Sequence, residues 1–188
     1  MKLVLVSGKA ESGKTEFSNH LKDSLCNIGY KCQIVSFADC LKFWAQAYFG
    51  WNGVKNQDGR ETLQRLGTDI ARNKNPDVWV KIIHEFLITF EDIFDFIIVD
   101  DARFKNEIYY FEDNLEGVLT IRIERPNHIS KLTMEQLLHP SETDLDDWEF
   151  DSVYYNSSDI EDMVFDIKDM VALDGFFTGN VWSSLSSM

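Results

Sequence analysis

Apolar residues along the chain form short continuous runs that alternate with stripes at helical spacing. The run at residues 2–6 predicts a strand buried on both faces, and Phe17, Leu21 and Leu25 recur every fourth residue in a helix expected at about 14–26. The same patterns predict strands at 33–37, 94–99, 118–123 and 152–155, and helices at 39–49, 60–73, 77–91 and 159–172. Strands separated by helices imply right-handed crossovers, and hence an α/β fold with a mostly parallel sheet and helices on both faces. Ligands of such sheets bind at the carboxyl ends of the strands.

The length of the chain limits the number of domains. Its 188 residues, 44% of them hydrophobic, are enough for one sizeable core and hardly enough for two, so we expect a single domain over residues 1–188. Cys26, Cys32 and Cys40 follow no CxxC or zinc-ligand spacing, which favours buried thiols over disulfides or a structural metal. The apolar run at the N-terminus is too short for a signal peptide, and no stretch reaches the ~20 apolar residues that span a bilayer. We therefore expect a soluble intracellular protein without membrane contact.

Acidic residues dominate the charge of the chain. The formal net charge is −14, and most of it lies after Arg125, where thirteen acidic residues face only Lys131 and Lys168. Such a field repels a nucleic-acid backbone, so nucleic acid is not an expected partner. Any phosphate group must instead be held by a local cluster of cations and backbone amides.

The strongest chemical signal is the string GKAESGKT at Gly8–Thr15, which matches the pattern GxxxxGK[ST] completely. It follows a predicted strand and opens a predicted helix, the context in which the pattern marks a phosphate-binding P-loop. Backbone amides and the helix N-terminus would surround the phosphates, Lys14 would reach the β- and γ-phosphates, and the Thr15 hydroxyl would bind Mg²⁺. The alternative is an ordinary Gly-Ser turn before a helix. The flanking elements favour a P-loop NTPase fold, a three-layer sandwich.

Two aspartates end a buried strand of the predicted sheet. Asp100 and Asp101 follow the apolar run at 96–99, and a carboxylate there can bind Mg²⁺ through its waters or orient the attacking oxygen. The spacing alone does not decide which of the two has this role. A strand-end aspartate that caps the following helix is the structural alternative.

Basic residues between the P-loop and residue 125 narrow the class of reaction. No guanine-reading Asn-Lys-x-Asp motif follows a later strand, which argues against a GTPase. Phosphoryl transfer requires several cations around two phosphate groups, which favours a kinase. Arg103 directly follows the strand-end aspartates and must lie near the phosphates if they do. The candidate cations are Lys42, Arg60, Arg65, Arg72, Arg103, Arg122 and Arg125.

An ordered set of short strings resembles the deoxynucleoside monophosphate kinases of bacteriophages and some bacteria. The matching strings are Ser7–Thr15, Phe37-Ala38-Asp39 with Leu41-Lys42, Gly59-Arg60-Glu61 with 63–68, Arg72, Pro76–Val80, Asp101–Glu107 and His139–Thr143. The resemblance covers about residues 3–165, and the set is far more specific than the P-loop alone. It implies an enzyme that transfers the γ-phosphoryl group of ATP, with Mg²⁺, to a deoxynucleoside monophosphate. It also implies the cytoplasm of a bacterium or phage-infected host cell, and a homodimer.

The resemblance implies roles that spacing alone does not supply. Residues 39–80 would form the monophosphate-binding region, about 126–147 the lid, and Asn156-Ser157-Ser158 the loop around the donor adenine, although this loop lacks the glycine usual there. Asp101, rather than Asp100, matches the acidic position of the family. Implied catalytic residues are Lys14, Asp101, Arg103 and Arg125, and implied metal ligands are Thr15 and Asp101. Implied donor-binding residues are Gly8, Ala10, Glu11, Ser12, Gly13, Lys14, Thr15 and Asn156. Implied acceptor-binding residues are Asp39, Lys42, Arg60, Gln64, Arg72, Trp79, Arg103 and Glu142.

Two alternative functions remain open on the sequence. Animal-type phosphomevalonate kinases share a similar P-loop, an Asp-x-Arg string at a strand end and a Ser-Glu-x-x-Leu-Asp pattern, so the acceptor could be another phosphorylated small molecule. A P-loop module that holds a nucleotide without turnover is the third hypothesis, which intact Lys14, Thr15, Asp101 and Arg103 oppose. Residues 175–188 are expected to form an appended tail, with two phenylalanines that pack against the body or a partner subunit.

Overall fold

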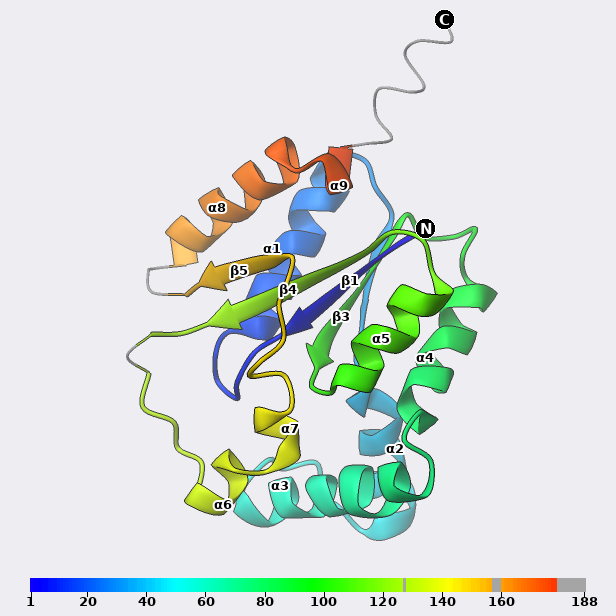
Figure 1. Cartoon of the computed structure of the whole chain (residues 1–188), viewed down its shortest axis with the longest axis vertical. Helices are drawn as coiled ribbons and strands as arrows, with labels where there is room; N and C mark the ends of the chain where they lie inside the picture. Colours follow the sequence, from blue (N-terminus) through cyan, green and yellow to red (C-terminus); the bar gives the residue numbers. More distant parts are fainter. Residues whose placement is uncertain (127, 157–159, 179–188) are drawn as a thin grey trace, which may run out of the picture.

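Five parallel strands form the sheet at the centre of the computed structural model, which describes residues 1–126, 128–156 and 160–178. The strand order is β2-β3-β1-β4-β5, and every pairing between neighbours is parallel (Figure 1). The strands are β1 (Lys2–Ser7), β2 (Cys32–Val35), β3 (Phe96–Ala102), β4 (Val118–Glu124) and β5 (Ser152–Tyr155). The predicted parallel α/β fold is confirmed.

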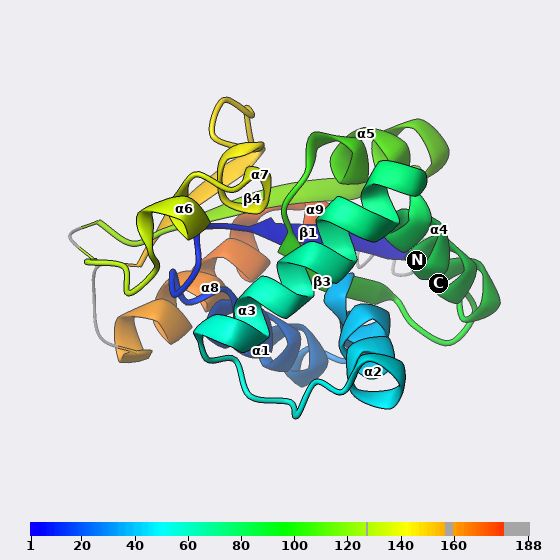
Figure 2. The same ribbon diagram turned by 90° about the horizontal axis from the view of Figure 1, so that it is seen from below.

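Helices cover both faces of this sheet, and β1 shows why. Its residues alternate between two cores because successive strand side chains point to opposite faces. Val4 and Val6 pack with α1 and α8, whereas Leu3 and Leu5 pack with α4 and α5. Figure 2 shows the resulting three layers. The larger helices are α1 (Lys14–Asn27), α2 (Ala38–Phe49), α3 (Gln57–Gln64), η1 (Arg65–Arg72), α4 (Val78–Thr89), α5 (Lys105–Asn114) and α8 (Ile160–Leu173). Single-turn helices are α6 (Met134–Leu137), α7 (Pro140–Thr143) and α9 (Gly175–Thr178).

The observed elements differ from the predicted ones near the strand ends. The strand predicted at 94–99 continues through both aspartates to Ala102, because β3 pairs with β1 up to Ser7. The helix predicted at 60–73 begins earlier, as α3, and its second half is the π-helix η1. Helix α5 lacked a prediction of its own, since its apolar stripe is short. Helix α4 begins one residue after the predicted start at 77.

The carboxyl ends of the central strands point toward α3, α6 and α7 (Figure 1). At the opposite end of the sheet, Phe177 of α9 is fully buried in the same core as α1, so this part of the predicted tail packs against the body. Residues 179–188, including Trp182, lie outside the described residues. Within the described part of the chain, no helix has the length and apolar character needed to cross a membrane.

Candidate phosphoryl-transfer site

The P-loop connects the end of β1 to the start of α1 through two glycines that tolerate no side chain. Gly13 has φ +99°, and a Cβ there would lie 2.3 Å from Asn156 Nδ2. A Cβ on Gly8 would lie 2.5 Å from the carbonyl oxygen of Ile123. The loop therefore approaches β4 and the end of β5 more closely than any other residue type permits.

Lys14 turns its ammonium group back onto its own loop. Nζ donates hydrogen bonds of 2.7 Å to the carbonyl oxygens of Gly8 and Lys9. Burial, reinforced by the nearby Arg103, lowers the pKa of Lys14 to about 7. The buried Ser12 Oγ has no hydrogen-bond partner in the structure. A bound phosphate group would supply the missing acceptor and counter-charge, so the loop fits a polyphosphate.

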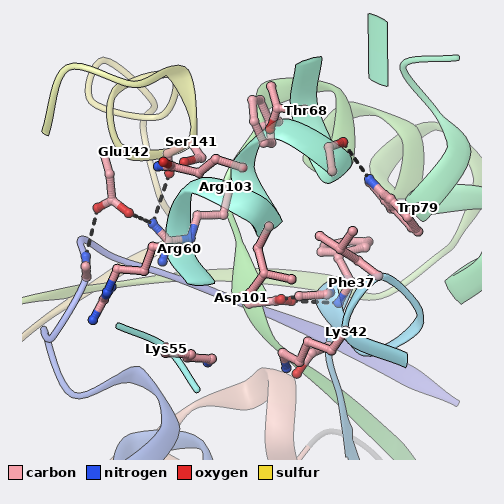
Figure 3. Close-up of a pocket in the computed structure, with 18 of the residues that line it drawn as sticks. Phe37, Lys42, Lys55, Arg60, Thr68, Trp79, Asp101, Arg103, Ser141 and Glu142 are labelled. Carbon is pink, nitrogen blue, oxygen red and sulfur yellow. Dashed lines mark hydrogen bonds and ion pairs between the residues drawn. The ribbon is translucent and has the colours of Figure 1, made fainter. Parts of the chain in front are cut away.

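Glu142 of α7 closes over the P-loop. Its Oε2 accepts a 2.8 Å hydrogen bond from the backbone N–H of Ala10, and its Oε1 pairs with Arg103 Nη1 (Figure 3). Arg103 also donates to the carbonyl oxygen of Ser141, at 2.9 Å. One buried carboxylate therefore bridges the phosphate-binding loop and the arginine after β3.

A backbone hydrogen bond and two ion pairs hold the segment after α7 to the body of the protein. Asp144 accepts from the backbone N–H of Lys105 at 2.7 Å, and Asp146 pairs with Lys9 at 2.5 Å and with Arg122 at 3.2 Å. These contacts place residues 142–147, the last part of the predicted lid, against the P-loop and the start of α5. Much of the negative charge seen in the sequence here meets cations at the rim of the site.

Asp101 is half-buried beneath the start of α2. Its two oxygens accept hydrogen bonds from the backbone N–H groups of Phe37 (2.7 Å) and Ala38 (3.0 Å). The carboxylate thus satisfies the first amides of α2 and not those of the helix that follows it in sequence, contrary to the capping alternative. Burial and the adjacent Asp100 raise the pKa of Asp101 to about 6. Asp100 accepts a 2.5 Å hydrogen bond from Ser36 Oγ.

A cavity of about 390 Å³, the first cavity, opens beside the P-loop at the carboxyl ends of the strands. It brings together Lys14, Thr15, Asp101 and Arg103 with most of the residues expected to bind an acceptor. Apolar side chains form much of the remaining wall. Predicted acceptor residues that line it are Lys42, Arg60, Gln64, Arg72, Trp79, Arg103 and Glu142, and apolar lining residues include Leu41, Leu63, Phe104 and Leu132.

Helix η1 forms one wall of the first cavity, and a π-type turn shapes it. Gly67 lies so close to α2 that an added Cβ would be 2.6 Å from Leu41. The carbonyl oxygen of Gly67 accepts a 3.0 Å hydrogen bond from Trp79 Nε1. Further along η1, Arg72 pairs with Glu107 and lies over the ring of Phe104, 4.0 Å from its centre. Such π-turns often occur at functional sites.

A second cavity of about 390 Å³ lies on the other side of the P-loop. Arg122 of β4 lines this second cavity, and so does Arg125, the residue after β4. Lys9 and Ser12 of the P-loop complete this side of the cavity. Ala10, Leu132 and Glu142 line both cavities and form the boundary between them. Two groups bound in the two cavities would therefore meet at the P-loop.

Glu11 links the P-loop to the predicted lid. It is the only described non-glycine residue with positive φ, at 63°. Its carboxylate accepts a 3.1 Å hydrogen bond from His128, which lowers the pKa of Glu11, and lies 3.9 Å from Arg60. The carbonyl oxygen of Glu11 accepts from Arg125 at 3.3 Å.

Some predicted site residues do not line either cavity. Asp39 points to the surface, where it pairs with Lys42 at 2.9 Å and accepts a 3.1 Å hydrogen bond from the Ser36 N–H. Gly8 and Gly13 shape the loop from behind. Asn156 donates from Nδ2 to the carbonyl oxygen of Ser12 at 2.8 Å, so it supports the P-loop directly. The rest of the expected adenine loop, Ser157 and Ser158, lies outside the described residues.

Sequence reasoning missed several residues of the first cavity. Lys55 lies in an irregular segment without any pattern, and burial together with Lys42 and Arg60 lowers its pKa. Thr68 and Glu107 are inside matched strings but carry no signal of their own. Only the fold brings them to one cavity.

Solved structures of small-molecule kinases share this fold. A sugar kinase from Janibacter sp. HTCC2649 matches with a TM-score of 0.57 and 16% identity, over 92% of this chain and 95% of the other. A gluconokinase from Sinorhizobium meliloti 1021 matches with a TM-score of 0.52 and 13% identity, over 91% of each chain. These likenesses show a P-loop kinase fold.

Sequence comparisons agree with this fold. A phosphomevalonate kinase of Drosophila melanogaster is 29% identical over 184 residues, 89% of this chain and 94% of that protein. Together with the P-loop and its cations, the comparisons define an ATP-dependent phosphotransferase of the P-loop kinase class, rather than a module without turnover. The chain belongs to the deoxynucleotide monophosphate kinase family, whose model matches residues 50–167.

Proposed function

We propose that this kinase transfers the γ-phosphoryl group of ATP to a deoxynucleoside 5′-monophosphate, giving the diphosphate and ADP. The observation that carries the proposal is the first cavity, which combines P-loop Lys14 with basic and apolar walls. Its volume of about 390 Å³ lies in the usual range of small-molecule sites. A nucleotide needs cations for its phosphate and apolar or aromatic surface for its base, and this cavity offers both.

The donor nucleotide belongs, in this proposal, to the P-loop and the second cavity. The loop amides at Ala10–Gly13 surround its phosphates, Lys14 neutralises the β- and γ-phosphates, and Arg125 contacts the donor beyond the loop. Asn156 keeps the loop in shape through Ser12. The acceptor phosphate then lies near Arg60 and Arg103 at the boundary of the two cavities.

The residues present also suit Mg²⁺. The Thr15 hydroxyl and the Asp101 carboxylate line the same cavity as Lys14, and hard oxygen donors are what Mg²⁺ prefers. When bound, Mg²⁺ neutralises charge on the phosphates. Asp101 already accepts two amide hydrogen bonds, so we assign it a contact through water and not a direct bond. A cluster of three metal-binding carboxylate, histidine or cysteine side chains is absent from the described residues, and a site completed by nucleotide phosphates does not require one.

Phosphomevalonate is the second candidate acceptor, because a phosphomevalonate kinase of Drosophila melanogaster is 29% identical to this chain. It also carries a phosphate, and the same cations would bind it. The apolar and aromatic residues Leu41, Leu63, Phe104 and Trp79 favour the nucleotide, since a short hydroxy acid leaves such a wall uncovered.

A coupled ADP-release assay with ATP and Mg²⁺ tests the proposal. The acceptors are dGMP, dTMP, dCMP and dAMP, the matching ribonucleotides, and phosphomevalonate. Lys14→Ala serves as the inactive control and should abolish turnover at saturating substrate. Turnover of at least one deoxynucleotide supports the proposal, whereas turnover of phosphomevalonate alone replaces the acceptor and keeps the kinase class.

A further inference from the structure

We propose that Glu107 is a positioning residue for substrate recognition: it fixes Arg72 in the wall of the first cavity so that Arg72 contacts the acceptor's base and not its phosphate. This inference rests on the proposed function, since it needs an acceptor with a base. Neither side chain has an obvious role in phosphoryl transfer itself. The contact between Arg72 and Glu107 joins two segments that are distant in sequence, so no local sequence pattern encodes it.

Glu107 connects two arginines of the cavity from the first turn of α5. Its side chain is fully buried, with 0% exposure. Oε2 accepts hydrogen bonds from the backbone N–H groups of Arg103 (2.7 Å) and Phe104 (3.0 Å), while Oε1 pairs with Arg72 Nη2. Oε2 thus binds the backbone that follows β3, and Oε1 binds η1.

Arg72 is held on two sides and leaves one nitrogen without a partner. Glu107 binds Nη2, and the guanidinium lies over the face of Phe104 at 4.0 Å from the ring centre. The side chain is only 11% exposed and lines the first cavity. Nη1 is buried and has no hydrogen-bond partner in the structure. Because an unsatisfied buried donor is costly, a ligand acceptor atom that reaches Nη1 would supply its missing hydrogen bond.

The charges around the cavity separate a phosphate end from a base end. Arg72 and the carboxylate of Glu107 together form a neutral pair, so this wall does not attract a second anion. Within the described residues Arg60 has one distant ion-pair partner, Glu11 at 3.9 Å, and Lys55 lies near Lys42 and Arg60 as well as Asp100 and Asp101, with a pKa lowered chiefly by burial. These cations suit a phosphate, whereas the neutral pair suits an uncharged acceptor atom such as a ring carbonyl oxygen or ring nitrogen.

The position of η1 supports the same division. Its Gly67 carbonyl oxygen binds the indole of Trp79, so Arg72 belongs to the wall that also carries this ring. Figure 3 shows Trp79 on the side of the cavity opposite Glu142, which contacts the P-loop. Trp79 and Phe104 both line the cavity here, and Arg72 covers one face of Phe104, so the wall around the donor is largely apolar and suits an uncharged base.

A purely structural role of Glu107, as the cap of α5, makes different predictions. The cap uses Oε2, so Glu107→Gln can keep it through the amide oxygen and lose only the pairing with Arg72. Arg72→Lys keeps the positive charge and loses the planar fork that Glu107 orients. Neither variant should change the KM for ATP if the inference is correct.

The experiment compares wild type, Arg72→Lys, Glu107→Gln and the double variant, with Asp147→Asn as control. Asp147 pairs at the surface with Lys105, the first residue of α5. Asp147→Asn therefore removes one negative charge, as Glu107→Gln does, but at a position away from the cavity. We measure kcat and KM for the best deoxynucleotide and for ATP, the inhibition constant of deoxyribose 5-phosphate, which lacks a base, and the melting temperature. The lysine variant, which leaves the cap of α5 intact, keeps the test valid if Glu107→Gln folds poorly.

We expect each single variant to raise the KM for the deoxynucleotide at least about tenfold, the loss of one charge-assisted hydrogen bond. The inhibition constant of deoxyribose 5-phosphate should stay within about twofold of wild type, and the double variant should be no worse than either single variant, as expected for one coupled pair. Equal weakening of deoxyribose 5-phosphate, or additive effects in the double variant, would overturn the inference while the proposed function stands. Failure of the wild type to use any deoxynucleotide would overturn both.

Discussion

Among single residues, Glu142 connects the P-loop to the arginine that follows β3. Its carboxylate binds the Ala10 N–H and Arg103, two groups that are suited to a phosphate. It also lies at the boundary that both cavities share. A carboxylate and a phosphate group repel each other when they share the same donors. In the proposed function, ATP therefore competes with Glu142 for the Ala10 N–H and for Arg103.

Glu142→Gln is therefore expected to bind ATP about tenfold more tightly, since the amide keeps an acceptor for Ala10 and removes the charge. Titration calorimetry with ATP and Mg²⁺ measures this directly. Glu149→Gln, a charge-matched change at an exposed position, should leave the affinity unchanged. Unchanged or weaker ATP binding in Glu142→Gln, combined with lower kcat, would show instead that Glu142 stays in place and orients Arg103 during transfer.

Lys14 predicts how ATP binding depends on pH. Its pKa of about 7 in the nucleotide-free protein means that about half of the molecules carry a neutral amine at neutral pH. Phosphates favour the ammonium form and raise this pKa, so binding takes up a proton above pH 7, and ATP affinity falls as pH rises from 7 to 9. Calorimetry at pH 8 in buffers of different ionisation enthalpy should detect the uptake. Its absence in wild type would show that Lys14 is already protonated.

The sequence predicted which residues meet at the first cavity where a motif fixes the backbone around them. Lys14 and Thr15 come after β1, Asp101 lies at the end of β3 and Arg103 follows it, and parallel strands bring such ends together at one edge. Asp39 lay outside this logic, since it belongs to the first turn of α2 and its exposed carboxylate contacts Lys42 and the Ser36 N–H without lining either cavity. Lys55 and Glu107 depend on contacts between distant segments, which no local pattern encodes.

Residues 50–72 form one wall of the first cavity, which the proposed function assigns to the acceptor; we call it the acceptor wall. Gly59 fixes the geometry of this segment. The first turn of α3 passes so close to the preceding loop that a Cβ on Gly59 would lie 2.0 Å from the carbonyl oxygen of Val54 and 2.8 Å from Trp51 Nε1. The carbonyl belongs to the backbone and cannot turn aside. Arg60, the next residue, lines the first cavity.

Gly59→Ala should therefore displace the start of α3 and raise the KM for the acceptor more than the KM for ATP. We expect a lower melting temperature as well, because the clash involves backbone atoms. Steady-state kinetics with both substrates and thermal unfolding measure the two effects. Gly29→Ala is a suitable comparison, because its φ of +102° imposes strain but its Cβ would meet no atom within 4 Å, far from the acceptor wall. An unchanged acceptor KM in Gly59→Ala would contradict this role of the loop.

Predicted elements were most accurate where the local pattern of residues determines them. The run at 2–6 became β1 because both of its faces meet helices, and the strand at 152–155 is observed at the same bounds. The π-helix η1 escaped prediction, since its widened turn follows from the contacts of Gly67 with Leu41 and Trp79. The helical pattern at 60–73 does not indicate that Leu41 and Trp79 would lie beside Gly67.

At the scale of the whole molecule, two cavities of similar volume meet at one loop in a protein of net charge −14. The overall field repels nucleotides, so affinity depends on the local cations around the P-loop. Asp146 pairs with Lys9 and Arg122, and Glu142 pairs with Arg103, so these two carboxylates neutralise several of those cations. In the proposed function, the phosphates of a nucleotide take the place of these internal anions.

The adjoining cavities predict strong binding of a single molecule that occupies both. An adenosine joined to the best deoxynucleoside through five phosphates places one nucleoside on each side of Ala10 and Leu132, and the linkage removes the entropic cost of a second binding event. Because ligand stabilisation grows with the logarithm of concentration over Kd, this compound should raise the melting temperature well above the value with ATP and the deoxynucleotide together at the same concentrations. Thermal unfolding measures the difference. The four-phosphate analogue is the matched control: it contains the three phosphates of ATP and the one of the monophosphate, and it is one phosphate shorter, so it spans the two cavities less well. Equal stabilisation by the compound and by ATP alone would mean that the cavities do not hold donor and acceptor at the same time, and the transfer would then need a rearrangement of the segment that carries Glu142.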